Sequence, residues 1–506
     1  MRKEISKQSC QLSCCWLALA LAACGSDEPS SSAHGATRAE LLDAQNCRSC
    51  HPQHYDEWSA SMHAHASRDP IFLAMNRRGQ EETAGELGSF CVNCHAPLAV
   101  REGATTDGLD LESVPEALQG VTCYACHNVE AIEANHNNGL RLSGDETLRG
   151  RLKDPQNNGF HASEYSPLLA GDSAESSALC GSCHDVVLPS GVALERTFAQ
   201  WQGSVFAPEH APVPSAVSTC AGCHMRGKSE PVAAGGPTRT RHSHHMAGVD
   251  TPLSADSADS AALADAQRAE LQRQLDTTLR IELCVQFTSD QRSAVEVIID
   301  NASAGHAFPS GAAHDRRAWV ELIAYSDGAP LYQSGVVPAD LPVTELDDPD
   351  LWLFRDEVRD LDGKPTHMFW DIASLTEQTI AAQVTSDPSD PDYYLSHAVR
   401  RFPRKSSEFI DGTPDRVTVR VRLQPIGLEV LDDLITSGHL DPRFRDAMPT
   451  FDLLPNRQLA APELSELTRV SMEWSAATLS SPVFASRQDA SVNPPKSCVG
   501  MPVRGR

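Results

Sequence analysis

The chain has 506 residues, of which 68 are Asp or Glu and 42 are Lys or Arg, so its formal net charge at pH 7 is −26. This length allows more than one domain, and the acidic balance argues against a nucleic-acid partner. The chain also has 16 cysteines and 20 histidines, against only 6% aromatic residues. Cysteine and histidine are therefore more informative about this chain than its aromatic residues.

The first 24 residues have the form of an export signal. Three basic residues among the first seven precede an apolar run over 12–23 that is too short to span a membrane. Leu21-Ala22-Ala23-Cys24 resembles the bacterial lipoprotein box, in which the cysteine becomes acylated. We therefore expect a signal peptide over 1–23, a lipid on Cys24, a tether over 24–37, and a protein anchored on the periplasmic side or outer surface of a bacterium. Gly25 favours the outer membrane, and an ordinary signal cleaved nearby is the alternative.

Five copies of Cys-x-x-Cys-His lie in a region that we assign to 38–250. This spacing is typical of c-type haem attachment, where two thiols bond the porphyrin vinyl groups and the histidine ligates the iron. Zinc knuckles need four ligands from paired motifs and give no reason for a histidine after every pair. Redox dithiols occur singly. The sequence predicts five covalently attached haem c groups. The attachment cysteines are Cys47, Cys50, Cys91, Cys94, Cys123, Cys126, Cys180, Cys183, Cys220 and Cys223, and the proximal ligands are His51, His95, His127, His184 and His224.

Between the motifs the sequence predicts short helices and loops, including a helix over 55–66, with no strand pattern of any length. A polar stretch over 250–260 predicts a linker, and 261–274 a helix, so we assign 251–275 to linker and helix.

Beyond this linker the pattern changes to strict alternation. Apolar and polar residues alternate over 279–287 and again over 417–423, and 295–299 and 319–325 look similar. We therefore predict a mainly antiparallel, sandwich-like β domain over 276–480, with a helix over 428–438 and a flexible tail over 481–506. The predicted fold class is α+β, with a haem-packed helical domain before the β domain. Cys284 and Cys498 are left over and could pair in an oxidising compartment.

Several spaced pieces resemble the cytochrome c-554 family. They are Cys47-x-x-Cys-His-Pro followed by Tyr55, Trp58, Ser61 and His63, then Cys91-Val-Asn-Cys-His-Ala-Pro-Leu-Ala, Gly120-Val-Thr-Cys-Tyr-Ala-Cys-His, Cys220-Ala-Gly-Cys-His-Met, 243–248 and 305–311. The resemblance implies haem-packed helices, bis-histidine ligation at most haems, and electron transfer. The chain departs from the family by its five motifs, where the name-giving members have four, and by its large C-terminal region.

The second axial ligand of each iron decides the function, because an iron with two histidines has no open position for a substrate. The resemblance implies His63, His161 and His244 as distal ligands, with His242 and His245 as rivals of His244. We add His136, which follows the third motif closely, and His306, which sits in a Gly/Pro-rich loop of the β domain. These five would saturate five irons. His65 would point differently from His63, and Met62, Met225 and Met246 are alternative ligands.

We expect a membrane-anchored electron carrier whose partners are other cytochromes or membrane electron-transfer complexes. No catalytic residue is assigned. The alternative is a multihaem oxidoreductase with one open haem, acting on nitrogen or sulfur oxyanions or hydroxylamine. A third interpretation makes the β domain a docking module for another cytochrome or a porin.

Overall fold

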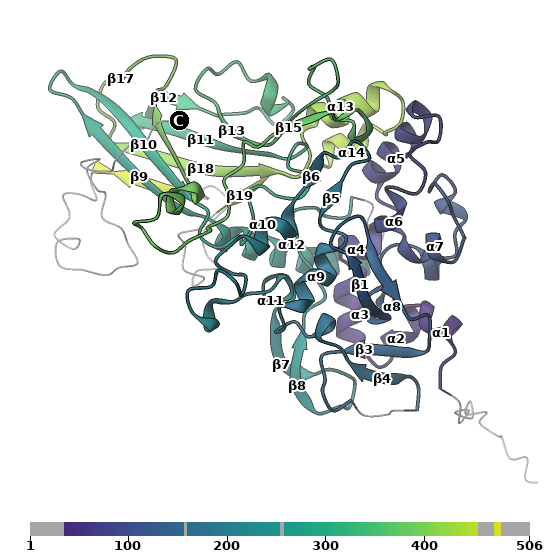
Figure 1. Ribbon diagram of the computed structural model, residues 1–506. Helices are drawn as coiled ribbons and strands as arrows, with labels where there is room; N and C mark the ends of the chain where they lie inside the picture. The colour runs from purple at the N-terminus through teal and green to yellow at the C-terminus, as the bar shows by residue number, and fades with distance from the viewer. Residues whose placement is uncertain (1–34, 156–158, 254–257, 454–469, 477–506) are drawn as a thin grey trace, which may run out of the picture.

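The computed structural model describes residues 35–155, 159–253, 258–453 and 470–476. The predicted signal peptide, Cys24, nearly all of the tether, Cys498 and the predicted tail lie outside these residues. Figure 1 shows short helices in the N-terminal half of the chain, coloured purple to blue, beside a β-rich C-terminal half coloured green. Within the described ranges, no helix has the length and apolar character needed to cross a bilayer.

The N-terminal part is built from short helices joined by loops, as predicted. The helices are α1 (Arg38–Leu42), α2 (Gln45–Arg48), α3 (Pro52–Ser59), α4 (Met62–His65), α5 (Pro70–Glu82), α6 (Val92–His95), α7 (Pro97–Arg101), α8 (Cys123–His127), α9 (Glu175–Gly181), α10 (Thr197–Gln202) and α11 (Cys220–His224). Each Cys-x-x-Cys-His motif lies on or directly after one of them. The backbone N–H of His51 donates to the carbonyl of Cys47 at 2.8 Å, and that of His184 to Cys180 at 2.9 Å, so each motif forms a helical turn.

The helix predicted over 55–66 is two helices, α3 and α4. Ser61 separates them because its backbone is extended, with φ −83° and ψ 157°. The Ser61 hydroxyl donates to the carbonyl of Trp58 at 2.7 Å, a local bond that competes with helix continuation. The break changes the direction of the chain immediately before His63.

The prediction of a strand-free N-terminal region is wrong. Four small two-stranded sheets occur there, formed by β1 (Val129–Ala134) with β2 (Gly139–Leu142), β3 (Thr147–Gly150) with β4 (Ala162–Tyr165), β5 (Val186–Val187) with β6 (Ala193–Glu195), and β7 (Gly227–Pro231) with β8 (Thr238–His242). The β3–β4 pair is parallel and the other three are antiparallel. Strands of two to six residues are too short for alternation to reveal them.

Helix α12 (Ala258–Thr278) contains the predicted helix over 261–274 and leads into the β region. A four-stranded sheet there consists of β9 (Arg280–Phe287), β10 (Arg292–Asp300), β16 (His397–Phe402) and β17 (Ile410–Asp411). A six-stranded sheet consists of β11 (Arg317–Ser326), β12 (Ala329–Ser334), β13 (Trp352–Phe354), β18 (Arg416–Gln424), β19 (Phe451–Leu453) and β20 (Met472–Ser475). A separate pair is β14 (Glu357–Arg359) with β15 (Ser374–Thr376).

The two larger sheets share one apolar core, as the sandwich prediction requires. In the four-stranded sheet Val297 of β10 lies opposite Leu283 of β9, and in the six-stranded sheet Val320 of β11 lies opposite Val421 of β18. All four side chains are buried in the same cluster. The alternation read over 279–287 and 417–423 therefore placed β9 and β18 correctly.

A helix of the β region packs against the N-terminal part. Helix α13 (Leu428–Thr436), close to its predicted range, is followed by α14 (Arg443–Asp446). Leu431 and Leu434 of α13 are fully buried in one cluster with Ile71 and Met75 of α5. The labels α13 and α5 accordingly lie next to each other in Figure 1.

Candidate haem sites

The five motifs define five sites, which we number 1 to 5 in chain order by their proximal histidines. The backbone carries them on α2, α6, α8, α9 and α11. The histidines at sites 1 to 5 are His51, His95, His127, His184 and His224.

Four of the proximal imidazoles are held in one tautomer by backbone carbonyls. The Nδ1–H donates to a carbonyl oxygen in each case: His51 to Val232 at 2.7 Å, His95 to Ala66 at 3.1 Å, His127 to Arg149 at 2.6 Å and His224 to Ala247 at 2.7 Å. This bond leaves the lone pair on Nε2, which is the arrangement of a metal-ligating histidine. These histidine side chains are therefore arranged to ligate a haem iron through Nε2.

Four proximal imidazoles also face a second imidazole from a distant part of the chain. The ring centres are 6.5 Å apart for His51 and His161, 6.3 Å for His127 and His244, 6.0 Å for His184 and His63, and 6.4 Å for His224 and His306.

These spacings match two imidazoles on opposite sides of one metal ion. A metal–nitrogen bond of about 2 Å on each side, plus about 1.2 Å from each nitrogen to its ring centre, gives a spacing of about 6.4 Å. Directly stacked rings would lie closer, as Phe72 and His95 do at 4.0 Å. The gap between the paired imidazoles is therefore the size of an iron atom with its two bonds.

Burial favours the neutral form of four of the paired imidazoles, those of His63, His184, His244 and His306. Burial, reinforced by neighbouring histidines, lowers the pKa of His63 to about 3 and that of His184 to about 4. Burial and the nearby His127 lower the pKa of His244 to about 4, and burial lowers that of His306 to about 4. Only the neutral imidazole can bind a metal, so this environment favours ligation.

Site 2 differs from the other four. Within the described chain, no histidine ring lies at the paired spacing from His95, whose ring stacks instead on Phe72 with an angle of 6° between the planes. The backbone bond from His95 to Ala66 still prepares Nε2 for ligation. The described residues therefore supply one imidazole, and not two, at site 2.

The structure does not bring His136 to a proximal histidine among the described residues. Its side chain is exposed after β1 and lies near Asp185. Its role as a ligand stays a prediction without geometric support.

The ring nitrogens of the other candidate histidines contact neighbouring protein groups. His65 donates from Nε2 to the carbonyl of Ser59 at 3.1 Å, His242 donates from Nδ1 to the carbonyl of Met225 at 2.6 Å, and Nδ1 of His245 contacts Gln267 at 2.8 Å. Among the methionines, the Met246 sulfur lies 2.9 Å from Nδ1 of His63. Met246 thus contacts the side of the His63 ring away from Nε2.

His54 lies among these histidines, although it was not predicted from the sequence. The His54 ring lies 5.5 Å from that of His51 and 4.7 Å from that of His244, and burial together with His244 lowers its pKa to about 2. His54 is three residues after His51, a spacing that puts both near one face of α3. This three-residue spacing could have indicated from the sequence that His54 lies close to site 1.

The attachment cysteines show which sites are neighbours. The Cys47 thiol interacts electrostatically with that of Cys123, Cys94 with Cys183, and Cys180 with Cys220. Cys126 interacts electrostatically with Cys183, as does His63 with His244. Sites 1, 3, 4 and 5 thus follow one another, and site 2 branches from site 4.

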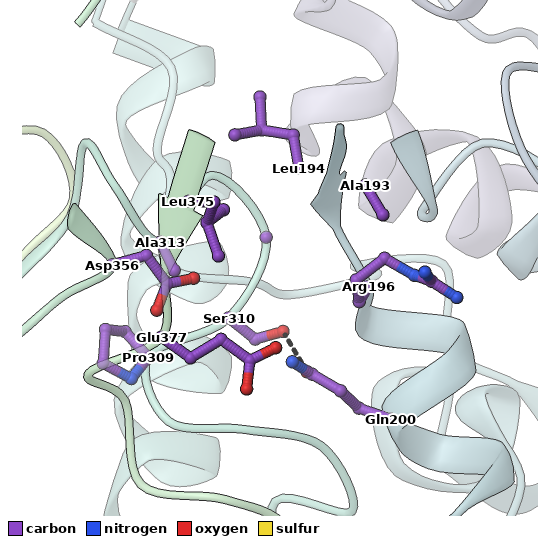
Figure 2. A pocket seen from close by; sticks show the side chains of 11 residues that line it. Ala193, Leu194, Arg196, Gln200, Pro309, Ser310, Ala313, Asp356, Leu375 and Glu377 are labelled. Atoms are coloured by element: carbon purple, nitrogen blue, oxygen red, sulfur yellow. Dashed lines mark hydrogen bonds between the residues drawn. The ribbon is translucent and has the colours of Figure 1, made fainter. Parts of the chain in front are cut away.

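The β region contributes to site 5 through the loop that carries His306. The Asn301 amide donates to the His306 carbonyl at 2.8 Å, and the Ala307 N–H donates to Gln200 of α10 at 3.1 Å. Figure 2 shows the small cleft beside this contact, where Gln200 reaches Ser310 and where Asp356 and Glu377 lie opposite Arg196. The loop and α10 together position the distal imidazole.

Two comparisons with known proteins found a similarity. The family described as cytochrome c554 and c-prime matches residues 46–128, which hold sites 1 to 3. The chain is also similar to the penta-heme cytochrome c552 from Thermochromatium tepidum, with a TM-score of 0.55 and 19% identity over 81% of this chain and 97% of that chain. Residues 46–128 are thus similar to the cytochrome c554 family, and the fold of the chain is similar to that of a penta-heme cytochrome. No curated protein sequence matches it.

A structural zinc site needs four ligands gathered around one ion. The described residues bring together no group of three or more His, Cys, Asp or Glu side chains that could hold a metal ion. Burial raises the pKa of the Cys91 and Cys126 thiols to about 12, which disfavours the thiolate form at these two positions. Thioether bonds to haem c remove the need for a thiolate.

Proposed function

We propose that this chain is a multihaem c-type cytochrome that carries electrons through five covalently bound haem c groups. The observation that supports the proposal best is the set of four opposed histidine pairs with ring centres 6.0 to 6.5 Å apart. An iron with an imidazole on each face exchanges electrons without binding a substrate. The distal ligands are then His161 at site 1, His244 at site 3, His63 at site 4 and His306 at site 5.

The order of neighbouring sites supports a continuous path for electrons. Sites 1 and 5 lie at the two ends of the series of neighbouring sites 1, 3, 4 and 5. The second attachment cysteine of each, Cys50 and Cys223, is exposed, while the other eight attachment cysteines are half-buried. Electrons pass between redox partner proteins, other cytochromes or membrane complexes, at these two ends.

Among the five sites, only site 2 favours a second function. An iron bound by His95 without a second histidine has an open position for a small molecule. The second candidate function is an oxidoreductase activity at site 2 on a nitrogen or sulfur oxyanion or on hydroxylamine, with electrons supplied through site 4.

The proposal places the protein outside the cytoplasm, anchored through Cys24 on the periplasmic side or outer surface. A Cys24→Ala variant is expected to leave the membrane fraction, because it lacks the cysteine that would carry the lipid anchor. Membrane fractionation with labelled fatty acid checks this, and a variant that stays fully membrane-bound after processing would refute the anchor.

Intact mass and reductive titration of the exported protein test the electron-transfer proposal. We expect five porphyrin adducts and uptake of five electrons per chain. A Cys180→Ser, Cys183→Ser variant is expected to lose one adduct and to slow electron exchange between sites 3 and 5, because site 4 connects them. Absence of porphyrin, or zinc in its place, would overturn the proposal.

A further inference from the structure

Three candidate ligands, His242, His244 and His245, lie within four residues at the end of β8. Within the described chain, His244 faces the proximal His127 of site 3, with ring centres 6.3 Å apart and 12° between the ring planes. The Nδ1–H of His244 donates to the carbonyl of His242 at 3.0 Å, which leaves Nε2 free to ligate. The side chains around this segment explain why His244 takes the place opposite His127.

We propose that Glu57 and Arg241 position His244, and not His242 or His245, as the distal ligand at site 3. The inference deepens the proposed function and rests on it, because it requires a haem iron between His127 and His244. Glu57 and Arg241 are positioning residues, because they act through the backbone of the segment.

Glu57 of α3 holds the backbone of the segment at His244. Its Oε2 accepts the backbone N–H of His244 at 2.8 Å and a guanidinium N–H of Arg241 at 2.7 Å, and its Oε1 accepts a second guanidinium N–H at 2.8 Å. Arg241 also donates from Nε to Glu230 of β7 at 2.7 Å. The Arg241 and Glu57 side chains are only 3% and 12% exposed. Charge-assisted hydrogen bonds shielded from water are strong, so the end of β8 is anchored to α3 immediately before His244.

His242 is turned away by the geometry of β8. Successive side chains of a strand point to opposite faces, so His242 points away from the face on which its neighbour Arg241 meets Glu57. The Nδ1–H of His242 donates to the carbonyl of Met225 at 2.6 Å. The anchored Arg241 therefore also fixes the side of the strand that His242 occupies.

His245 is held by helix α12. Its Nδ1–H donates to the side-chain oxygen of Gln267 at 2.8 Å, and the Gln267 amide donates back to the carbonyl of His245 at 3.0 Å. Gln267 is 2% exposed, and Nε2 of His245 lies 4.0 Å from Oε1 of Glu57. His245 thus faces Glu57 and α12, whereas His244 faces His127.

The ring of His244 is supported by the helix that also supplies Glu57. The His54 ring lies 4.7 Å from the His244 ring, edge to face, with 80° between the planes. His54 and Glu57 are three positions apart on α3, so they share one face of that helix. This face therefore contacts both the backbone and the imidazole of the distal ligand.

Ferric magnetic resonance spectra of the haem-loaded protein test the proposal, with His244→Ala as the reference for a site 3 that lacks its distal ligand. Glu57→Ala is expected to remove the same low-spin signal that His244→Ala removes, because the segment loses its anchor. The signals of sites 4 and 5 should remain in place. His242→Ala and His245→Ala alone should leave every signal unchanged. A Glu57→Ala spectrum identical to that of the wild type would overturn the proposal.

A double variant separates positioning from general destabilisation. Where Glu57→Ala gives a new low-spin signal at site 3, a neighbouring histidine has replaced His244, and adding His245→Ala or His242→Ala should convert site 3 to high-spin. A structural role alone would not make a previously silent histidine essential. A new signal that persists in both double variants would show that His244 still ligates, and would overturn the proposal.

The matched control is Asp154→Asn. Asp154 pairs with Arg239 of the same strand through two hydrogen bonds of 2.9 and 3.0 Å, but its side chain is 63% exposed. Its loss should leave the site 3 signal unchanged, and loss of that signal would overturn the specific role of Glu57.

Haem content by mass shows whether each variant has folded. If Glu57→Ala carries less haem, Glu57→Gln replaces it with the same expected outcomes, because it keeps the side-chain volume but offers a single acceptor oxygen to the three N–H groups. Unchanged spectra in His244→Ala, or a wild-type chain without haem at site 3, would instead contradict the proposed function.

Discussion

His306 joins the β region to the haem sites, because its imidazole faces His224 across 6.4 Å. His306→Ala is expected to remove one distal ligand and to convert about one haem in five from low-spin to high-spin, since an iron with one imidazole has an open position. The ferric optical and magnetic resonance spectra check this.

The matched control is His136→Ala. His136 is exposed and faces none of the proximal histidines among the described residues, so its removal should leave the spectra unchanged. A high-spin signal in His136→Ala would restore it as a distal ligand. Unchanged spectra in His306→Ala would remove His306 from the ligand set.

Asp350 shows how a single carboxylate ties the sandwich together. It accepts hydrogen bonds from the Tyr332 hydroxyl at 2.9 Å and from the backbone N–H groups of Arg404 at 2.9 Å and Lys405 at 2.6 Å. Burial alone would raise its pKa, but the hydrogen bonds from Ser406 and the backbone outweigh burial and hold the pKa at about 2.

The low pKa of Asp350 predicts a loss of stability in acid. A folded pKa below the unfolded value gives stability that is present above about pH 4 and is lost as the pH falls towards 2, amounting to about 2 kcal/mol. Denaturant unfolding between pH 2 and 6 checks this. Asp350→Asn should lose this part of the pH dependence, whereas the exposed Asp362→Asn should keep it; equal profiles for Asp350→Asn and the wild type would contradict the assignment.

At the scale of elements, α13 carries much of the contact between the two halves of the chain. Leu431 is fully buried among residues of α5 and α13, so Leu431→Ala should lower the free energy of unfolding by about 2–5 kcal/mol. The control is Leu361→Ala, whose side chain is 93% exposed, with an expected change near zero. Equal unfolding midpoints for the two variants would show that the α13–α5 contact does not stabilise the fold.

The elements predicted from sequence were those whose pattern is local and long. Alternation over 279–287 and 417–423 identified β9 and β18, strands of eight and nine residues, and the Cys-x-x-Cys-His spacing identified the candidate haem sites. The two-residue β5 and the break at Ser61 were missed, because neither leaves a periodic signal. Which histidine faces which could not be derived from the residues alone, since His161 and His51 are 110 positions apart and meet only through the tertiary fold.

At the scale of the molecule, both halves of the chain contribute histidines to the proposed haem sites. The β region supplies His306, which faces His224 of site 5, while Arg316 and Asp250 join the two regions through two hydrogen bonds. A truncated chain ending before β9 should therefore lack the distal ligand at site 5. The proposed redox unit therefore includes the C-terminal half.

The ligand set of the five irons tests the account most directly. Magnetic resonance of the ferric protein, with signals integrated against total haem iron, should give four low-spin haems with two imidazoles and one high-spin haem at site 2. Five low-spin signals would contradict the open position at site 2. Iron without the low-spin signals of paired imidazoles would contradict the account as a whole.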